Sequence, residues 1–353
     1  MGTNEVSGGF FPRRILMVQL RQVGDAIMCT PAIRALRRAC PESRIDFLAE
    51  GPAAGAVARN PYLDHIIVSE AHSSSETLRT ISRIRGNRYD LVVDYLANPT
   101  SALISVLSGA TVTLSYGGKR RSRFYTHTVV PQGQYSAAHK LSLLKTLGIV
   151  ERTANIGLMR DGGHLKPDFF VSKEAYERVG GWLRRIGIAS GERFVVIDPT
   201  HRRITRRYTR YAEVARMVKD KLGFRCVFVW GPGEEEEVRF ISMQAGEGHV
   251  MAPRTDLDEL GALTSCAALL VGNDSAPRHI AAALSVPTVI VVGSTRPENW
   301  TLPSPIHRTV SLDIECRPCE KNVCPLDHLD CMTKLDPEKI LSEITDVLEK
   351  HHF

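Results

Sequence analysis

Short apolar segments alternate with amphipathic segments along most of the chain. The apolar segments are rich in Val, Ile and Leu, a composition typical of strands buried on both faces of a sheet. The predicted strands are residues 15–20, 44–49, 65–68, 91–95, 112–115, 194–197, 225–230, 267–271 and 288–292. The predicted helices are residues 25–38, 76–85, 101–107, 137–147, 173–185, 209–221, 234–244 and 257–265, with one more between the last two strands. This alternation predicts an α/β fold with mostly parallel sheets.

The alternation is interrupted at residues 159–168, which are polar and contain Gly and Pro. We interpret this segment as a linker between two doubly wound, Rossmann-like domains, residues 1–165 and 166–353. A chain of 353 residues has the length of two domains. In such an arrangement the expected binding site is the cleft that the two domains face.

The sequence also predicts where in the cell the protein is located and whether its cysteines are reduced. Hydrophobic residues make up 43% of the chain and charged residues 24%, as in globular proteins. No segment has the apolar length of a membrane span, and the N-terminus lacks the pattern of a signal peptide, so we expect a cytoplasmic protein. Cys29, Cys40, Cys226 and Cys266 stand singly in apolar or helical segments and are expected to be reduced core residues.

The net charge of +6 favours an anionic partner, such as a nucleotide, a nucleic acid, a phosphorylated glycan or a membrane surface. Two basic runs carry much of this charge. One contains Lys119, Arg120, Arg121 and Arg123, and the other contains Arg202, Arg203, Arg206, Arg207 and Arg210. The first run has few aromatic neighbours, which argues against RNA binding.

Residues 271–297 combine a strand end, a polar turn, a helix and a second strand. Asp274 and Ser275 are suitable N-cap residues, and Pro277 suits the first helical turn. The free backbone N–H groups near Ser275 and Ala276 would follow the carboxyl end of a strand, where helix N-termini bind phosphate. The alternative is that Asp274 only caps the helix and His279 only packs.

Gly24 and Asp25 follow the first predicted strand and place a carboxylate at its carboxyl end. Gly24 would allow a substrate to approach the backbone. The alternative role of Asp25 is a helix N-cap. Pro31 lies within the helical pattern, so the helix either kinks there or begins at Thr30.

Two further turns follow strands in the second half. The arginines after residues 194–197 could hold a diphosphate, although a solvated helix face is the simpler interpretation. Glu234 begins an acidic first helical turn, which favours the helix dipole and could instead bind ribose hydroxyls. The chain lacks the G-x-G-x-x-G, P-loop and H-E-x-x-H motifs, which argues against a dinucleotide dehydrogenase, a P-loop NTPase and a zincin.

Four segments in this order resemble glycosyltransferase family 9, the ADP-heptose:lipopolysaccharide heptosyltransferases. They are R-I-L-M-V-Q-L-R-Q-V-G-D-A-I-M-C-T-P-A-I-R-A-L-R, the G-P-G-E turn, N-D-S-A-P-R-H-I-A-A-A-L-S-V-P-T and the C-R-P-C…C-P…C-M tail. The resemblance spans nearly the whole chain. It implies a GT-B fold, with the acceptor bound mainly by the N-terminal domain and the nucleotide-sugar by the C-terminal domain. It also implies inverting transfer without a metal or other cofactor.

The resemblance assigns roles to residues that match the family's motifs. Asp25 matches the proposed catalytic base, and Glu234 matches the glutamate at the nucleotide ribose. The diphosphate motif D-[ST]-G-x-x-H is matched by Asp274, Ser275 and His279, with Ala276 in place of the usual Gly.

The family's K-R-W-P segment is replaced by R-R-Y-T, so the cationic phosphate ligand becomes either Arg206 or Arg207. The expected reaction has an acceptor hydroxyl lose its proton to Asp25 and attack the anomeric carbon, with ADP leaving toward this arginine and Ser275. The alternatives are another sugar nucleotide or acceptor, or a nucleotide- or nucleic-acid-binding module without turnover.

Cys316, Cys319, Cys324 and Cys331 provide enough thiols for a tetrahedral zinc site, but their spacing is not that of two C-x-x-C pairs. Reduced packing cysteines or a labile disulfide are the alternatives, and we predict no metal.

The basic run that begins at Lys119 is expected to hold a lipid-linked, phosphorylated oligosaccharide acceptor and to bring the enzyme to the inner face of the inner membrane. The alternative is a solvated loop without such a role.

Overall fold

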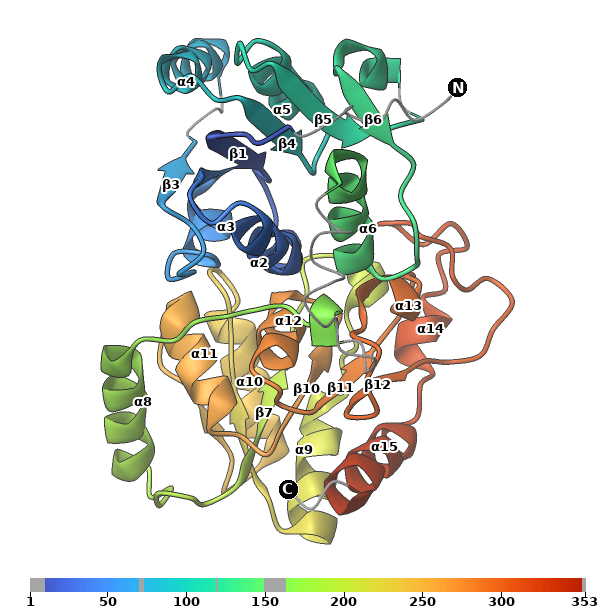
Figure 1. Ribbon diagram of the computed structural model, residues 1–353. Helices are drawn as coiled ribbons and strands as arrows, with labels where there is room; N and C mark the ends of the chain where they lie inside the picture. Colours follow the sequence, from blue (N-terminus) through green and yellow to red (C-terminus); the bar gives the residue numbers. More distant parts are fainter. Residues whose placement is uncertain (1–9, 70–72, 119, 149–162, 351–353) are drawn as a thin grey trace. The chain divides into compact units, whose positions relative to one another are not determined.

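The computed structural model describes residues 10–69, 73–118, 120–148 and 163–350, and the chain divides into two compact units, Met1–Phe169 and Phe170–Phe353 (Figure 1). The sequence analysis placed this division between residues 165 and 166. The linker predicted at residues 159–168 lies partly outside the described residues.

Unit 1 contains a six-stranded sheet in the order β3-β2-β1-β4-β5-β6, with every described strand pair parallel. Its strands are β1 (Arg14–Val18), β2 (Arg44–Ala49), β3 (His65–Val68), β4 (Leu91–Asp94), β5 (Val112–Tyr116) and β6 (His127–Val129). Its helices are α1 (Val23–Met28), α2 (Thr30–Ala39), α3 (Gly51–Gly55), α4 (Ser74–Gly86), α5 (Pro99–Val106) and α6 (Ser136–Ser142), with 3-10 turns η1 (Arg120–Phe124), η2 (Leu143–Leu147) and η3 (Gly163–Leu165). The strand order reverses between β1 and β4, which makes their carboxyl ends the expected site of this unit.

Unit 2 contains a second parallel sheet in the order β12-β11-β10-β7-β8-β9. Its strands are β7 (Phe194–Asp198), β8 (Arg225–Phe228), β9 (Val250–Met251), β10 (Leu269–Asn273), β11 (Thr288–Val291) and β12 (His307–Val310). Its helices are α8 (Lys173–Arg185), α9 (Tyr211–Leu222), α10 (Glu235–Ala245), α11 (Leu257–Ser265), α12 (Ala276–Ala283), α13 (Pro297–Trp300), α14 (Asp330–Thr333) and α15 (Pro337–Lys350), with the turn η4 (Ile204–Arg206). Counted from β7, the strand order is the same as in unit 1, and it reverses between β7 and β10.

Both faces of the second sheet are buried, as its continuous apolar strands predicted. Val195 and Ile197 pack into one core cluster, whereas Phe194 and Val196 pack into another. Successive side chains of a strand point to opposite faces, so β7 supplies both layers. In unit 1, α4 and α5 pack on the face that carries Leu16. Within the described residues, no helix is long and apolar enough to cross a bilayer.

The helix predicted at residues 25–38 is two helices, because the chain turns at Cys29 between α1 and α2. The hydroxyl of Thr30 donates to the carbonyl oxygen of Ile27 at 2.7 Å, and Pro31 lies in the first turn of α2. The prediction that a helix begins at Thr30 is therefore confirmed, but the residues before it form the helix α1 and not the irregular turn that was expected with it. Cys266 is exposed, contrary to prediction, because it follows α11 at the C-cap, beyond the buried stripe of that helix.

Candidate active site

The strand ends at the reversal point of unit 2 lie close together because one of them carries a glycine. Gly272 of β10 is paired with Asp198 of β7. A Cβ atom on Gly272 would lie 2.8 Å from both the Cβ and the carbonyl oxygen of Asp198, so a larger residue would separate the strands. The carboxylate of Asp198 is thereby placed beside the start of α12.

Asp198 is a buried acid that the sequence analysis did not select. Its Oδ2 accepts a hydrogen bond from the hydroxyl of Ser275. Burial is the main cause that raises the pKa of Asp198 to about 7; the Ser275 bond opposes this rise, and the negative charge of Glu234 adds to it. In the sequence, Asp198 could have been found as the polar residue that follows the apolar run 194–197.

Ser275 is the N-cap of α12, and within the described chain its side chain makes no capping hydrogen bond. Its backbone N–H donates to the carbonyl oxygen of Asn273 at 2.9 Å. Ala276 begins the helix, whose first turn contains no acidic side chain. The N–H groups of this turn keep the partial positive charge of a helix N-terminus, which suits an anion.

Asp274 does not cap α12, contrary to the simpler interpretation. Its carboxylate accepts from Nη1 of Arg278 at 2.6 Å and from the hydroxyl of Thr295 at 2.7 Å, and all three groups are buried. Burial alone would raise the pKa of Asp274, but the charge of Arg278 and the Thr295 bond hold it below its ordinary value. Asp274 is therefore ionised, and its contacts with Arg278 and Thr295 hold the start of α12 in position.

His279 is buried on α12, with its ring centroid 6.2 Å from that of Trp300. Burial lowers its pKa to about 3, and the charge of Arg278 contributes to this shift. The imidazole is therefore neutral at physiological pH, and any contribution to phosphate binding would come from its N–H group and not from a charge.

The two candidate arginines after β7 have different surroundings. Arg206 points its Nη1 toward Oδ2 of Asp274 at 3.9 Å, and its buried Nε has no hydrogen-bond partner in the described chain. Arg207 donates from Nε to the carbonyl oxygen of His201 at 2.8 Å and lies 3.3 Å from Glu237. The guanidinium of Arg206 thus keeps donors for an anion near α12, whereas Arg207 is directed elsewhere.

Asn273 fixes the loop that carries Arg206. Its Oδ1 accepts from the backbone N–H of Tyr208 at 3.0 Å, and its Nδ2 donates to the carbonyl oxygen of Pro199 at 3.0 Å. Asn273 is fully buried and ends β10, so it holds both ends of this loop.

Glu234 is the N-cap residue of α10. Its Oε2 accepts hydrogen bonds from the backbone N–H of Gly231 and from the hydroxyl of Thr200, both at 2.8 Å. These bonds hold the carboxylate beside the carboxyl end of β8 and near the loop after β7. A role at a ribose is compatible with this position and stays a prediction.

In unit 1, Asp25 lies in the first turn of α1 together with Gly24, not in a turn before the helix. Its Oδ1 lies 3.4 Å from Nζ of Lys140, and its side chain is 26% exposed. The N-cap of α1 is Gln22, so capping is not the role of Asp25. The carboxylate is reachable from solvent on one side and faces a cation on the other.

Lys140 lies on α6 and is only 3% exposed. Its ammonium also donates to Oε1 of Gln19 at 3.2 Å and lies 5.7 Å from the ring centroid of Tyr95. Burial opposes its charge, but the acidic groups of Cys29, Asp25 and Tyr116 raise the pKa of Lys140 above its ordinary value.

The sequence analysis missed Lys140. Its only signal was a lysine on the apolar side of the predicted helix, three residues after Ala137 and three before Leu143.

The basic run after β5 forms the turn η1. Arg120, Arg121 and Arg123 are exposed, and Lys119 lies outside the described residues. The hydroxyl of Thr126 donates to the carbonyl oxygen of Thr113 at 2.9 Å. The segment therefore returns from the carboxyl end of β5 to its amino end. Its role in acceptor binding stays a prediction.

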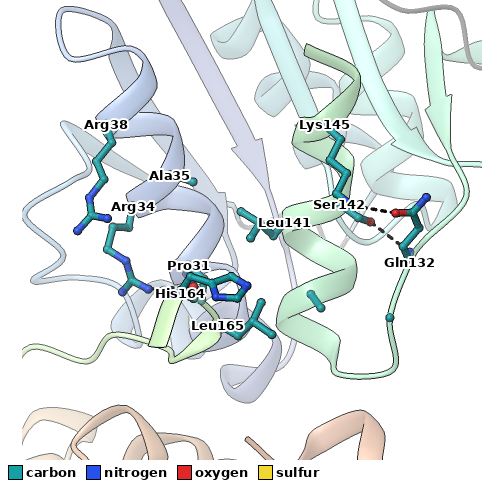
Figure 2. A pocket seen from close by; sticks show the side chains of 12 residues that line it. Pro31, Arg34, Ala35, Arg38, Gln132, Leu141, Ser142, Lys145, His164 and Leu165 are labelled. Carbon is teal, nitrogen blue, oxygen red and sulfur yellow. Dashed lines mark hydrogen bonds between the residues drawn. The ribbon is translucent and has the colours of Figure 1, made fainter. Parts of the chain in front are cut away.

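A cavity of about 440 Å³ lies between α2 and α6 (Figure 2). Arg34 and Arg38 approach it from α2, and Lys145 approaches from η2, which follows α6. Arg34 pairs with Asp168, whereas Lys145 donates to Oε1 of Gln132 at 2.8 Å. Arg34 and Lys145 are thus engaged with residues of their own unit. The sequence analysis did not anticipate this cavity, because its walls are far apart along the chain.

Cys316, Cys319, Cys324 and Cys331 line one small cavity in unit 2 and are not joined in disulfides. Among the described residues, no group of three or more His, Cys, Asp or Glu side chains is placed to hold a metal ion.

Parallel sheets with a helix N-terminus and a half-buried arginine in one unit, and a carboxylate beside a buried lysine in the other, have the features of a transferase that uses an activated sugar. The family model of glycosyltransferase family 9 (heptosyltransferase) matches residues 77–330, and the chain belongs to this family. The protein is therefore a glycosyltransferase, and its two-sheet α/β architecture is the GT-B fold.

Lipopolysaccharide heptosyltransferase 3 of Escherichia coli (strain K12) is 26% identical over 300 residues, which cover 80% of this chain and 83% of the relative. The glycosyl transferase family 9 structure from Veillonella parvula DSM 2008 has a TM-score of 0.82 at 20% identity, covering 96% of this chain and 98% of that chain. The structure of E. coli ADP-heptose lps heptosyltransferase II has a TM-score of 0.77 at 22% identity, covering 96% and 100%.

Proposed function

We propose that this glycosyltransferase transfers a heptose from ADP-heptose to the core of a lipopolysaccharide, with inversion at the anomeric carbon and with Asp25 as the general base. The names of two similar proteins, lipopolysaccharide heptosyltransferase 3 and ADP-heptose lps heptosyltransferase II, support the donor and acceptor classes. The observation that carries the catalytic assignment is the pair formed by Asp25 and the buried Lys140.

The donor is assigned to unit 2. The diphosphate of an ADP-sugar would lie at the N-terminus of α12, where the N–H groups that follow Ser275 attract an anion. Arg206 would bind the phosphates from the opposite side with the guanidinium donors that remain available. Glu234 would accept hydrogen bonds from the ribose hydroxyls, as acidic residues after strands do in related folds.

The acceptor is assigned to unit 1, where Asp25 removes a proton from its hydroxyl group. A general base must be ionised before it can act. The ammonium of Lys140 attracts the carboxylate of Asp25 and holds it in one direction. Lys140 therefore acts through Asp25 as a positioning residue.

The chemical step forms one bond and breaks one. The acceptor oxygen forms a bond to the anomeric carbon while its proton passes to Asp25. The bond from the anomeric carbon to the phosphate oxygen breaks on the opposite face, and ADP carries away the electron pair. Arg206 and the helix N-terminus at Ser275 stabilise the negative charge that develops on this leaving group.

A lipid-linked acceptor would bring the enzyme to the inner face of the inner membrane, and the exposed arginines of η1 are suitable for its anionic groups. This assignment of location is part of the proposal.

The experiment is to incubate the protein and its Asp25→Asn variant with a panel of ADP- and UDP-sugars and a heptose-deficient core oligosaccharide. The proposal expects turnover with ADP-heptose and a product of opposite anomeric configuration by NMR. Turnover with a UDP-sugar only would contradict the donor, retained configuration would contradict the mechanism, and unchanged turnover in Asp25→Asn would contradict the base.

A further inference from the structure

We propose that the outer surface formed by α4, α5 and η1 binds an anionic lipid bilayer. This surface is called the α5 face below. The proposal goes beyond the chemistry assigned to Asp25 and adds the contact that a lipid-linked acceptor requires. It rests on how α5 distributes its polar and apolar side chains.

Helix α5 buries Ala102 and Ile104 against the sheet but also directs apolar side chains to solvent. Ser101 and Ser105 are fully buried, whereas Leu103 is 46% exposed, Val106 is 36% exposed and Leu107, the C-cap residue, is 40% exposed. Surface helices ordinarily direct their apolar side chains toward the core. The three apolar residues are spaced at i, i+3 and i+4, so they form one continuous stripe on the solvent side.

The two buried serines of α5 make hydrogen bonds inside unit 1. The hydroxyl of Ser105 donates to Oδ2 of Asp94 at 3.4 Å, and Ser101 takes part in the capping box of the helix with Asn98. These contacts fix which side of α5 faces the sheet. The exposed stripe is therefore a consequence of satisfied polar contacts inside the unit.

The turn η1 packs against α5 and adds an exposed aromatic side chain. Phe124 is 54% exposed, and the guanidinium of Arg123 lies 4.9 Å from its ring centroid. Aromatic and aliphatic side chains beside arginines are the composition of surfaces that insert at the boundary between lipid headgroups and acyl chains.

Arginines of the neighbouring elements α4 and η1 lie beside the apolar stripe. On the other side of α5, Arg85 of α4 donates from Nη1 to the carbonyl oxygen of Leu107 at 3.1 Å, so its charge lies at the end of the stripe. The three elements together contain six arginines and one acidic residue, Glu76, while α5 and η1 contain no acid. Glu76 is engaged in the capping box of α4.

The positive charge of the α5 face indicates that its partner is anionic. Exposed apolar side chains framed by arginines complement a surface that is anionic at the headgroups and apolar beneath them. A bilayer with acidic lipids has both properties. In Figure 1, α4 and α5 lie on one side of the unit 1 sheet and α2 and α6 lie on the other. Substitutions on the α5 face therefore leave the contact between Lys140 and Asp25 in place.

The test measures the fraction of full-length protein that floats with lipid vesicles. One set of vesicles is phosphatidylcholine alone, and the other also contains phosphatidylglycerol at about a third of the lipid. Two variants remove one property each: Leu103→Asn with Leu107→Asn removes the apolar stripe, and Arg120→Gln with Arg121→Gln removes charge. The matched control replaces two exposed apolar residues of α10 in unit 2, Phe240→Ser with Met243→Ser; Phe240 is 60% exposed and Met243 is 73% exposed.

We expect the wild-type protein and the α10 control to float with anionic vesicles, and both variants to lose roughly tenfold or more in vesicle partitioning. Equal binding to neutral vesicles, unchanged binding of either variant, or an equal loss in the α10 control would overturn the proposal. So would a wild-type protein that stays unbound and self-associates through this face, because the partner would then be a second copy of the chain.

The vesicle experiment needs neither donor nor acceptor, so its outcome is separate from that of the transfer reaction. Turnover on a short soluble acceptor should be the same in the variant Leu103→Asn with Leu107→Asn as in the wild-type protein, because neither leucine is assigned to the donor or the acceptor. Loss of turnover on that acceptor with intact vesicle binding would contradict the separation of the two surfaces.

Discussion

The ammonium group of Lys140 lies 3.4 Å from the carboxylate of Asp25, and the two residues belong to helices that are more than 100 positions apart in the chain. The lysine is buried and the carboxylate is partly exposed. A cation beneath a reachable carboxylate holds that carboxylate in position without blocking it from solvent. This pair is the basis of the first two predictions.

Asp25→Asn should lower kcat roughly 100- to 10,000-fold, because the amide cannot accept the acceptor proton. The affinity for ADP should stay within about twofold of wild type, since the donor is assigned to unit 2. Steady-state kinetics and calorimetry with ADP check both parts. Wild-type turnover in this variant would remove Asp25 from the mechanism.

Lys140→Met should lower kcat roughly tenfold or more with little change in KM, because the carboxylate of Asp25 loses the cation that holds it in position. Lys140→Arg keeps a cation at this place and should retain more of the activity. Steady-state kinetics separate kcat from KM, and circular dichroism checks that each variant is folded. Wild-type kcat in a folded Lys140→Met variant would show that Lys140 serves stability alone.

Arg206→Ala should weaken ADP binding roughly 10- to 100-fold, because it removes a charge-assisted contact from a half-buried position. Arg207→Ala is the matched control, since its guanidinium is engaged by His201 and Glu237, and it should change the affinity less than about threefold. Isothermal titration at two salt concentrations checks this order. If both variants bound ADP as tightly as the wild-type protein, Arg206 would not be a phosphate ligand.

Nucleotide-sugar binding should weaken as pH rises through about 7, where Asp198 ionises beside the start of α12. An ionised carboxylate repels a diphosphate, so we expect roughly a tenfold change between pH 6 and pH 8. ADP-glucose is the suitable probe because its diphosphate keeps a constant charge over this range. Asp198→Asn should remove the dependence, and a variant that retains the full slope would assign it to another group.

The same group makes the stability of the fold depend on pH with a defined sign. The folded-state pKa of Asp198 is raised from 3.8 to about 7. Its contribution is therefore fully present below the unfolded value of 3.8 and is lost as pH rises toward 7. Urea unfolding between pH 4 and pH 8 should show a shallower decline in Asp198→Asn than in the wild-type protein.

Gly272→Ala should lower the free energy of unfolding by about 1–3 kcal/mol, since the new methyl group would meet Asp198 across the strand pair. Chemical denaturation measures the loss. Gly109→Ala is not a clean control because Gly109 has a positive φ. Gly51 has open space around a Cβ and an ordinary φ, so Gly51→Ala should be neutral or stabilising.

Much of the fold could be predicted from the sequence because both sheets consist of buried parallel strands with continuous apolar runs. The bounds of β2, β3, α8 and α11 agree with the predicted ranges. The short edge strands β6, β9 and β12 were missed, since they contain only two to four residues, and β6 and β12 also include polar side chains. The last helix, α15, was also missed, although Ile340, Leu341 and Ile344 have helical spacing.

The candidate site was predictable where a polar residue follows a strand, and not where distant segments meet. The sequence placed Asp25, Ser275 and Glu234 after strands, because strand ends are visible as the end of an apolar run. It did not reveal Lys140, whose partner is on another helix. Nor could it distinguish Arg206 from Arg207, because their difference is a matter of which neighbours each guanidinium reaches.

Each unit has its own parallel sheet with its own reversal of strand order. Under the proposed assignment of the acceptor to unit 1 and the donor to unit 2, the specificities for the two substrates could evolve independently. Substitutions around the strand ends of unit 1 would then alter which glycan is accepted without disturbing the contacts of Asp198, Arg206 and Asp274 in unit 2. A lineage that keeps one activated sugar would therefore diversify its acceptors by changing the first half of the gene.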